Sequence, residues 1–417
     1  MRNVSCCLIV ALTVCVVRGE DWTEFRGSKM ASGHASVALP TEWSETENVT
    51  WKVPVPGIGW SSPVVADGAI YLTTSVGDGD GFKDPQSLRV LRLNAETGKQ
   101  EWNVELFQQP GKTVQVHKKN SHASATPIIE GDRIYVHFGA SGTACVTTSG
   151  EVVWKKTLKY APLHGNGGSP ALHGSNLIIC CDGSDTQYVV GMDKKTGDIN
   201  WKQDRNCEVR RGFSFCTPTV IEASGRVQAI CPGSGKVVSY DPDTGKELWH
   251  VDYGEGYSVV PRPVFANGLV YVCSGFSDGQ LFAIDPGGEG DVTETHVKWK
   301  IKGGVPQSPS ILVVGKEVYL VSDRGVATCR DALTGEELWK RRLNGKFSAS
   351  PSFANGHVYF SDENGTTTVA VAAREYQQVS RNAIAGGKER TFASFGVVDQ
   401  AILLRSEQHL YRIEDKK

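Results

Sequence analysis

Several short segments of the chain combine arginine, aromatic rings, histidine and amide side chains just before a small-residue–proline pair. The richest of them runs Arg210-Arg211-Gly-Phe213-Ser-Phe215, ahead of Thr217-Pro218. Arginine forks bind carboxylate and phosphate groups, and aromatic rings stack on planar ones. These segments predict a pocket for an anionic or planar ligand, with Arg211, Tyr257 and His164 as the leading candidates. The other candidate ligand-binding residues are Asn166, Arg262, Trp60, His122 and Gln307.

The alternative is that these side chains are ordinary solvent-exposed polar residues of loops, and that the arginines link neighbouring structural units. The same two interpretations apply to Asp182, Asp185, Asp278 and Asp323, which follow apolar runs in the adjoining loops. Residue types and spacing leave both interpretations open.

The sequence predicts no catalytic residues and no metal ligands. A Ser-His-Asp hydrolase is discounted, and there is no haem-binding Cys-x-x-Cys-His. His117, His122 and His164 lack the close spacing of a metal site. The acidic segment from Gly77 to Asp84 has spaced carboxylates for Ca²⁺ but lacks the terminal Glu of an EF-hand loop, so we expect a flexible acidic loop.

One phrase repeats along the chain at intervals of about 50 residues, which indicates a repeated supersecondary unit. A Thr-Gly turn is followed four residues later by tryptophan, as in Asp193-Lys-Lys-Thr-Gly197-Asp-Ile-Asn-Trp201. Each unit opens with a small residue and proline and continues with a Gly turn between β-rich runs, which is Asn-Gly or Asp-Gly at Asp67-Gly68, Asn267-Gly268 and Asn355-Gly356. Such turns are strong hairpin signals, and four short antiparallel strands per unit describe one blade of a propeller.

The count of units predicts an all-β, eight-bladed β-propeller, with seven blades as the fallback. Seven openings are present, and the eighth unit is divided between the two ends of the chain. The C-terminal runs 392–404 and 409–413 lack a tryptophan strand, whereas Asn48-Val-Thr-Trp51-Lys-Val-Pro is a tryptophan strand without its unit. Joining them closes the ring and removes exposed sheet edges. In the fifth unit an insertion after Asp285 delays the tryptophan to Trp299.

The regular tryptophans are interpreted as packing at the seams between blades, since they fall on outer strands far from the axis. A buried aromatic side chain contributes about 1.5–3 kcal/mol by area, and stability then becomes a sum over seams. Ligand stacking by these tryptophans is the competing interpretation.

The Asp-x-x-x-Gly-x-x-x-Trp phrase, with a small residue two positions before the Asp, resembles the tryptophan-docking motif of quinoprotein-type propellers. Gly191-Met-Asp193 to Trp201 illustrates it, and Ala283-Ile-Asp285 starts it before the insertion breaks the spacing. The resemblance covers nearly the whole mature chain, which is similar to exported PQQ-like repeat proteins. It implies two kinds of relative: pyrroloquinoline-quinone (PQQ) dehydrogenases, and BamB-like outer-membrane assembly factors, which have the propeller without the cofactor.

Two functions follow from this resemblance. The favoured one is a non-catalytic exported propeller, acting as a binding or scaffold protein for a protein, peptide or glycan in the cell envelope. The alternative is a PQQ-dependent alcohol or sugar dehydrogenase, which needs an Asp base beside the quinone and Ca²⁺ held by carboxylate and amide oxygens. No set of residues can be assigned to those roles, and the loops are short where a dehydrogenase would build walls. A propeller fold by itself decides neither.

Residues 1–19 are predicted to be a secretory signal peptide, which leaves residues 20–417 as one propeller domain. Arg2 is followed by a short apolar run, Leu8 to Val17, and by small residues near Gly19. No later segment is apolar for long enough to span a membrane. The formal net charge of -2 argues against a nucleic-acid partner. We expect a periplasmic or extracellular monomer.

Eight cysteines remain after the signal, and most lie in strand-like apolar runs, where cysteine behaves as a small hydrophobe. Mostly free thiols are therefore expected. Cys207 with Cys216, which flank one loop, is the better disulfide candidate. The adjacent pair Cys180-Cys181 resembles a disulfide found over the cofactor of some PQQ dehydrogenases, but its place in an apolar strand favours packing.

Overall fold

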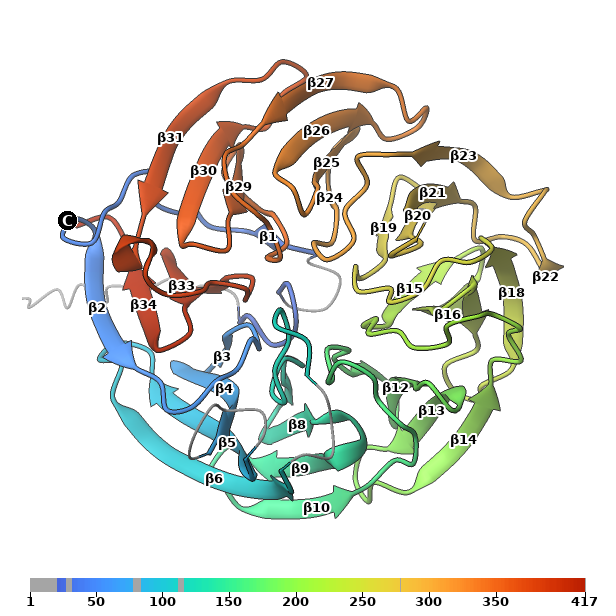
Figure 1. The fold of residues 1–417 in the computed structure, drawn as a ribbon, viewed down its shortest axis with the longest axis horizontal. Helices are drawn as coiled ribbons and strands as arrows, with labels where there is room; N and C mark the ends of the chain where they lie inside the picture. The colour runs from blue at the N-terminus through green and yellow to red at the C-terminus, as the bar shows by residue number, and fades with distance from the viewer. Residues whose placement is uncertain (1–20, 28–31, 78–83, 112–115, 278, 417) are drawn as a thin grey trace, which may run out of the picture.

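The computed structural model describes residues 21–27, 32–77, 84–111, 116–277 and 279–416. These residues form eight sheets, each built on four antiparallel strands, arranged as blades around a central channel (Figure 1). The eight-bladed β-propeller predicted from the repeat is confirmed. Regular helix among the described residues is confined to two 3₁₀ turns, η1 (Gly139–Ser141) and η2 (Ala385–Gly387). No helix in the described ranges is long and apolar enough to cross a membrane.

The blades are numbered here in chain order, each from its inner to its outer strand. Blade 1 is β3 (Val64–Ala66), β4 (Ala69–Val76), β5 (Gln86–Asn94) and β6 (Gln100–Gln109). Blade 2 is β7 (Ile128–Glu130), β8 (Arg133–His137), β9 (Thr143–Thr147) and β10 (Val152–Lys156). Blade 3 is β11 (Ala171–His173), β12 (Asn176–Asp182), β13 (Gln187–Asp193) and β14 (Ile199–Asp204). Blade 4 is β15 (Thr219–Ala223), β16 (Arg226–Pro232), β17 (Lys236–Tyr240) and β18 (Glu247–Asp252).

The second half of the ring repeats this order. Blade 5 is β19 (Val264–Ala266), β20 (Leu269–Cys273), β21 (Gln280–Ile284) and β23 (Val297–Lys302). Blade 6 is β24 (Leu312–Val314), β25 (Glu317–Val321), β26 (Val326–Asp331) and β27 (Glu337–Arg342). Blade 7 is β28 (Ser352–Ala354), β29 (His357–Ser361), β30 (Thr366–Val371) and β31 (Gln378–Ala383). Blade 8 is β32 (Gly396–Val398), β33 (Ala401–Arg405), β34 (His409–Ile413) and β2 (Val49–Pro54).

The ring is closed by the N-terminal strand β2, which forms the outer strand of blade 8. It pairs antiparallel with β34, with Val53 opposite Leu410 and Trp51 opposite Arg412. In Figure 1 the blue β2 lies directly beside the red β34. The division of the eighth unit between the two ends of the chain is therefore confirmed.

The tight turns between the first and second strands have the geometry that their sequences predict. Asn267 and Gly268 have φ of 53° and 75°, and Asn355 and Gly356 have φ of 43° and 79°. A two-residue hairpin turn of this type needs positive φ at both positions, which Asn and Gly adopt most readily. These turns lie on the same face of the ring as the Thr-Gly turns.

The hydrophobic core is distributed over the seams between neighbouring blades. One cluster joins blades 1 and 2 through residues such as Val64, Val90, Ile134 and Val146, and further clusters join the later pairs in turn. Another cluster joins blades 7, 8 and 1 across the closure. Stability is therefore built from nearest-neighbour interfaces, as in other repeat architectures.

The outer-strand tryptophans dock onto the next blade, which confirms the packing interpretation. The Trp201 indole Nε1 donates a 3.1 Å hydrogen bond to the carbonyl of Pro242, and its ring covers the turn at Gly245. A Cβ at Gly245 would lie 2.5 Å from that ring, so the tryptophan requires glycine in the turn. Trp51, Trp102, Trp154, Trp299 and Trp339 repeat the bond to a carbonyl of the following blade.

Trp249 departs from this pattern because of the insertion in the fifth unit. Its Nε1 donates to Gln228 within its own blade, and the ring is fully buried. The inserted residues form β22 (Gly290–Asp291), which pairs parallel with β18 and adds a fifth strand to blade 4. The short β1 (His34–Ala35) likewise adds a fifth strand to blade 7, beside β28.

The cysteines from Cys145 onward are free thiols. The predicted Cys207–Cys216 disulfide is wrong. Cys207 Sγ instead lies 3.1 Å from the carbonyl of Ser234, and the buried Cys216 Sγ lies 3.4 Å from the carbonyl of Pro261. Cys180 and Cys181 pack on opposite faces of β12, in two different seam clusters. The remaining thiols are mostly buried, as their place in apolar strands predicts.

Candidate functional site

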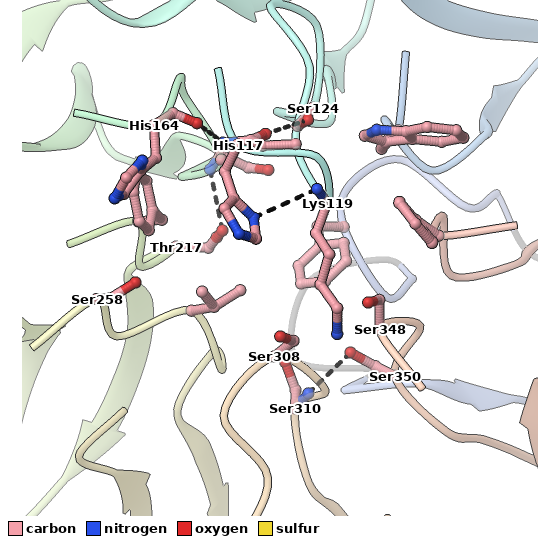
Figure 2. Close-up of a pocket in the computed structure, with 18 of the residues that line it drawn as sticks. His117, Lys119, Ser124, His164, Thr217, Ser258, Ser308, Ser310, Ser348 and Ser350 are labelled. Carbon is pink, nitrogen blue, oxygen red and sulfur yellow. Dashed lines mark hydrogen bonds between the residues drawn. The ribbon is translucent and has the colours of Figure 1, made fainter. Parts of the chain in front are cut away.

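A cavity of about 320 Å³ lies in the central channel, on the face where the loops entering the inner strands meet (Figure 2). This volume is at the lower end of the range of about 300–1,000 Å³ that small-molecule sites occupy. Its lining combines aromatic rings with serine and threonine hydroxyls, and includes Arg211 and Lys119. The segments before the inner strands do therefore converge on the channel mouth.

The N-terminal segment Asp21–Gly27 crosses the channel and closes the cavity below. Trp22 pairs with Val65 of blade 1, while the Arg26 guanidinium donates to the carbonyls of Ile311 and Pro351, next to blades 6 and 7. Glu24 forms a 2.8 Å ion pair with Arg262 at the start of blade 5, which lies opposite blade 1, so the segment spans the ring. Phe25 lines the cavity and forms its floor. Nothing in the sequence indicated that this segment crosses the channel.

One wall of the cavity is a continuous series of aromatic contacts contributed by successive loops. The ring of His164 lies 5.6 Å from that of His117 and 5.3 Å from that of Phe213. Phe213 lies 5.5 Å from Tyr257, and Tyr257 lies 6.4 Å from Phe276. The edge-to-face geometry of most of these pairs is the favourable one for aromatic rings. The series gives the cavity a rigid apolar side.

Trp60 and Phe392 form a second aromatic group that also lines the cavity. Their rings lie 4.7 Å apart, and the Arg390 guanidinium sits over both, at 5.4 Å from Trp60 and 5.8 Å from Phe392. Arg390 is held in turn by Glu407, with Nε 3.0 Å from the carboxylate. This arrangement is a cation–π stack whose cation is already paired.

Two cationic side chains reach the cavity, in different electrostatic states. Arg211 is exposed, and its guanidinium lies 4.8 Å over the ring of Tyr257 and donates to the Tyr257 hydroxyl. Lys119 Nζ lies 2.8 Å from the Glu363 carboxylate and 3.6 Å from that of Asp323. Lys119 is therefore neutralised by protein carboxylates, whereas Arg211 is oriented by an uncharged partner and keeps its charge for a ligand.

The two histidines at the cavity are neutral at neutral pH. Partial burial, and then the charge of Arg211, lower the pKa of His164 below its usual value. Partial burial and the neighbouring His164 likewise lower the pKa of His117. Both rings therefore contribute aromatic surface and hydrogen bonding rather than positive charge.

The structure brings four of the eight predicted site residues to the cavity: Trp60, His164, Arg211 and Tyr257. The other four are outside its lining. The backbone of Asn166 forms an antiparallel β-bridge with Ser121. His122 is buried, and burial lowers the pKa of its ring. The backbone of Gln307 donates to Asp323, and Arg262 forms a 2.8 Å ion pair with Glu24 of the floor segment. Arg262 therefore ties blades to the N-terminal segment, as the alternative interpretation of the arginines expected.

The loop aspartates also have structural partners. Asp182 is fully buried in a bidentate pair with Arg205, whose Nη1 also donates to the carbonyl of Cys231 in blade 4. Asp185 accepts the backbone N–H of Ala161, and Asp323 accepts those of Gln307 and Ser308. Asp278 lies outside the described residues, as do residues 78–83 of the acidic loop.

Sequence reasoning missed Phe25, Phe276, Phe392 and Lys119, which line the cavity. It also missed a girdle of hydroxyls at the starts of the inner strands. The small residue before each proline was read only as the start of a unit, although its repeated Ser or Thr identity was a usable signal. In blade 6 the equivalent position is Ser310 rather than Ser308, two residues beyond the opening that the Ser308-Pro309 pair predicted.

The lining does not fit a PQQ–calcium group. That group needs carboxylate and amide oxygens around the ion and an Asp base beside the quinone. No Asp or Glu lines the cavity among the described residues, and the nearby Asp323 and Glu363 are paired with Lys119. The adjacent cysteines are free thiols in different seams.

The fold and the cavity together define an eight-bladed, PQQ-like propeller whose loop face carries a pocket with no acidic side chain among its described lining residues. Residues 37–180, 162–290 and 277–382 match the family model described as outer membrane protein assembly factor BamB, and the chain belongs to that family.

Individual relatives agree with this assignment. The chain is similar to the outer membrane protein assembly factor BamB of Burkholderia pseudomallei (strain K96243), with 24% identity over 73% of this chain and 71% of that protein. The crystal structure of BamB from Moraxella catarrhalis superposes with a TM-score of 0.61 and 14% identity, covering 88% of this chain and 97% of that one. A quinohemoprotein alcohol dehydrogenase from Pseudomonas putida HK5 superposes with a TM-score of 0.68 and 11% identity, over 95% of this chain and 81% of its own. At such identities the structural matches establish the fold alone.

Proposed function

We propose that this chain is an exported, non-catalytic propeller that holds a protein partner of the cell envelope on its loop face, as a scaffold in outer-membrane protein assembly. The family assignment supports the scaffold role. The observation that carries the proposal is the composition of the loop-face cavity: aromatic walls and a free guanidinium, with no carboxylate among the described lining residues. Such a surface binds and orients a group, and its described residues offer no carboxylate as a base or as a metal ligand for oxidation.

The loop face has the features expected of a docking surface. Arg211 is exposed at its centre, and Arg is enriched at protein interfaces together with Tyr, which Arg211 stacks upon. The opposite face consists of short turns held by their own Asp and Thr side chains, such as Asp193, which accepts from the backbone of Lys195 and Thr196. The polar side chains of these turns are therefore engaged in hydrogen bonds within the turn, whereas the Arg211 guanidinium is available to a partner.

Photo-crosslinking from the two faces in intact cells tests the proposal. A photoreactive residue in place of the exposed Arg210, on the loop face, is expected to give adducts with outer-membrane proteins or with proteins that assemble them. The matched control replaces the exposed Lys195, on the turn face, and is expected to give none. Arg211→Ala combined with the position 210 probe should lower the adduct yield without changing thermal stability. Adducts from position 195 alone, or equal adducts from both faces, would contradict the face assignment.

A further inference from the structure

The starts of the inner strands carry a ring of hydroxyl side chains around the channel axis. In seven of the eight blades the position is serine or threonine, and all seven hydroxyl residues line the cavity: Ser62, Thr126, Ser169, Thr217, Ser310, Ser350 and Ser394. We call this set the hydroxyl ring. Its members are between 1% and 5% exposed, so their side chains face the cavity rather than bulk solvent. Blade 5 has Arg262 at the equivalent position.

Six of the seven hydroxyl oxygens accept a backbone N–H from the preceding blade, and Ser62 Oγ is the exception. The backbone N–H of Ser62 donates to Thr126 Oγ1 at 3.0 Å, and that of Thr126 to Ser169 Oγ at 2.8 Å. The link from Ser169 to Thr217 is 2.9 Å. The links from Arg262 to Ser310, Ser310 to Ser350 and Ser350 to Ser394 are also 2.9 Å each.

The protons of these hydroxyls are left without a protein acceptor. A serine or threonine hydroxyl has one O–H donor besides its lone pairs. Because the lone pairs receive the backbone N–H, the proton must be donated elsewhere, and no acceptor for it is found among the described residues. Ser62 Oγ is the clearest case, since it is 1% exposed and has no partner in either role. A buried polar group without a partner is destabilising, so a ligand acceptor is favoured there.

The surroundings of the hydroxyl ring favour an acceptor that is negatively charged. No carboxylate lines the cavity in the described part of the chain. Arg26, the residue after the floor residue Phe25, is a buried guanidinium whose hydrogen bonds go to backbone carbonyls. Burial and then Arg262 lower the pKa of Arg26 to about 9, which keeps it protonated at neutral pH. The exposed Arg211 adds a second positive charge at the cavity.

We propose that the hydroxyl ring is an oxyanion-binding site, which takes a carboxylate, sulfate or phosphate group on the channel axis. The anion accepts O–H hydrogen bonds from several blades at once, with Ser62 as a donor that has no competing protein partner. For an organic acid, the aromatic walls above the ring accommodate the apolar part. The site shares the cavity and Arg211 with the proposed docking surface, but small anions test it without a protein partner, so its failure is distinguishable from failure of the scaffold role.

Isothermal titration of the full mature chain at constant ionic strength tests this proposal. The probes are sulfate, phosphate and benzoate, with benzyl alcohol as the uncharged counterpart of benzoate. We expect saturable binding of at least one anion and weaker binding of benzyl alcohol. A preference for benzoate over the inorganic anions would identify an organic acid as the ligand class, and the reverse would identify an inorganic oxyanion.

Ser62→Ala isolates the contribution of the ring, because it removes a donor without removing any hydrogen bond within the protein. We expect a loss of about tenfold or more in anion affinity, as for a hydrogen bond to a charged group, with unchanged thermal stability. Ser149→Ala, at an exposed serine on the turn face, is the matched control and should bind as the unmodified chain does. As a readout without a variant, the bound anion should raise the melting temperature of the unmodified protein above that in chloride. Equal binding of benzoate and benzyl alcohol, no saturable anion binding, or unchanged anion affinity in Ser62→Ala would overturn the proposal.

Discussion

Replacement of Trp201 by alanine is expected to open the seam between blades 3 and 4. The indole covers the Gly245 turn and donates a 3.1 Å hydrogen bond to the carbonyl of Pro242, and the side chain is 8% exposed. Loss of a buried tryptophan side chain costs about 3–5 kcal/mol, the sum of lost transfer energy and the cavity that remains. Trp201→Phe keeps most of the ring and loses the hydrogen bond, so a smaller loss that includes about 1 kcal/mol for that bond is expected.

Gly245→Ala probes the same seam from the other side. Gly245 has φ of +74°, and an added Cβ would lie 2.5 Å from the Trp201 ring. The left-handed backbone alone costs a non-glycine residue about 1–2 kcal/mol. Gly68→Ala is the matched control, since Gly68 has φ of +71° and nothing within 4 Å of an added Cβ. The difference between the two glycine variants therefore measures the contact with Trp201.

Urea unfolding followed by circular dichroism and tryptophan fluorescence would measure these free energies, provided that the two signals coincide. We expect Gly245→Ala to be more destabilising than Gly68→Ala in the unmodified chain, and the two to become equal when Trp201 is alanine. Equal costs in both backgrounds, or a Trp201→Ala loss below about 1 kcal/mol, would refute the seam account.

Two further predictions concern buried ionisable groups. Asp182→Ala should lower the free energy of unfolding by about 3–5 kcal/mol, because it leaves the Arg205 guanidinium buried without its carboxylate. The double variant Asp182→Ala/Arg205→Met should recover more than half of that loss in the same urea assay. Equal losses in the two variants would contradict this. Burial lowers the pKa of His137 from 6.5 to about 4. The folded state therefore binds this proton less well than the unfolded state, and the free energy of unfolding should fall by about 3 kcal/mol as the pH drops from about 6.5 to about 4. His137→Gln should remove that part of the pH dependence, and an unchanged profile would show that the group does not contribute.

Most of the architecture was predictable from the repeat, because each unit of the sequence contains its own turn residues and its own docking tryptophan. The phrase from Gly197 to Trp201, the Asn-Gly turns and the separated strand around Trp51 each predict one local geometry, and the structure has all three. The insertion after Asp285 was visible as an irregularity. Its strand pairing with blade 4 was not, since a two-residue strand has no periodicity of its own.

The candidate site was less predictable, because loop residues reach the cavity or turn away from it according to contacts with distant parts of the chain. Arg211 and Arg262 have similar sequence contexts, yet Arg262 is drawn to Glu24 of the segment that crosses the channel. Phe25 and Lys119 reach the cavity only because the N-terminal segment and the 116–120 loop fold across it. The failed Cys207–Cys216 pairing has the same origin, since closeness in sequence did not align the two thiols.

The most direct test of the central functional claim, that this propeller binds without catalysing oxidation, is titration of the purified chain with PQQ in the presence of Ca²⁺. Cofactor uptake would be followed by absorbance after dialysis, and turnover by dye-linked oxidation of alcohols and sugars. The account predicts no stoichiometric uptake and no turnover, because the described lining offers no carboxylate for the ion or for the base. One equivalent of retained PQQ together with substrate-dependent dye reduction would contradict it.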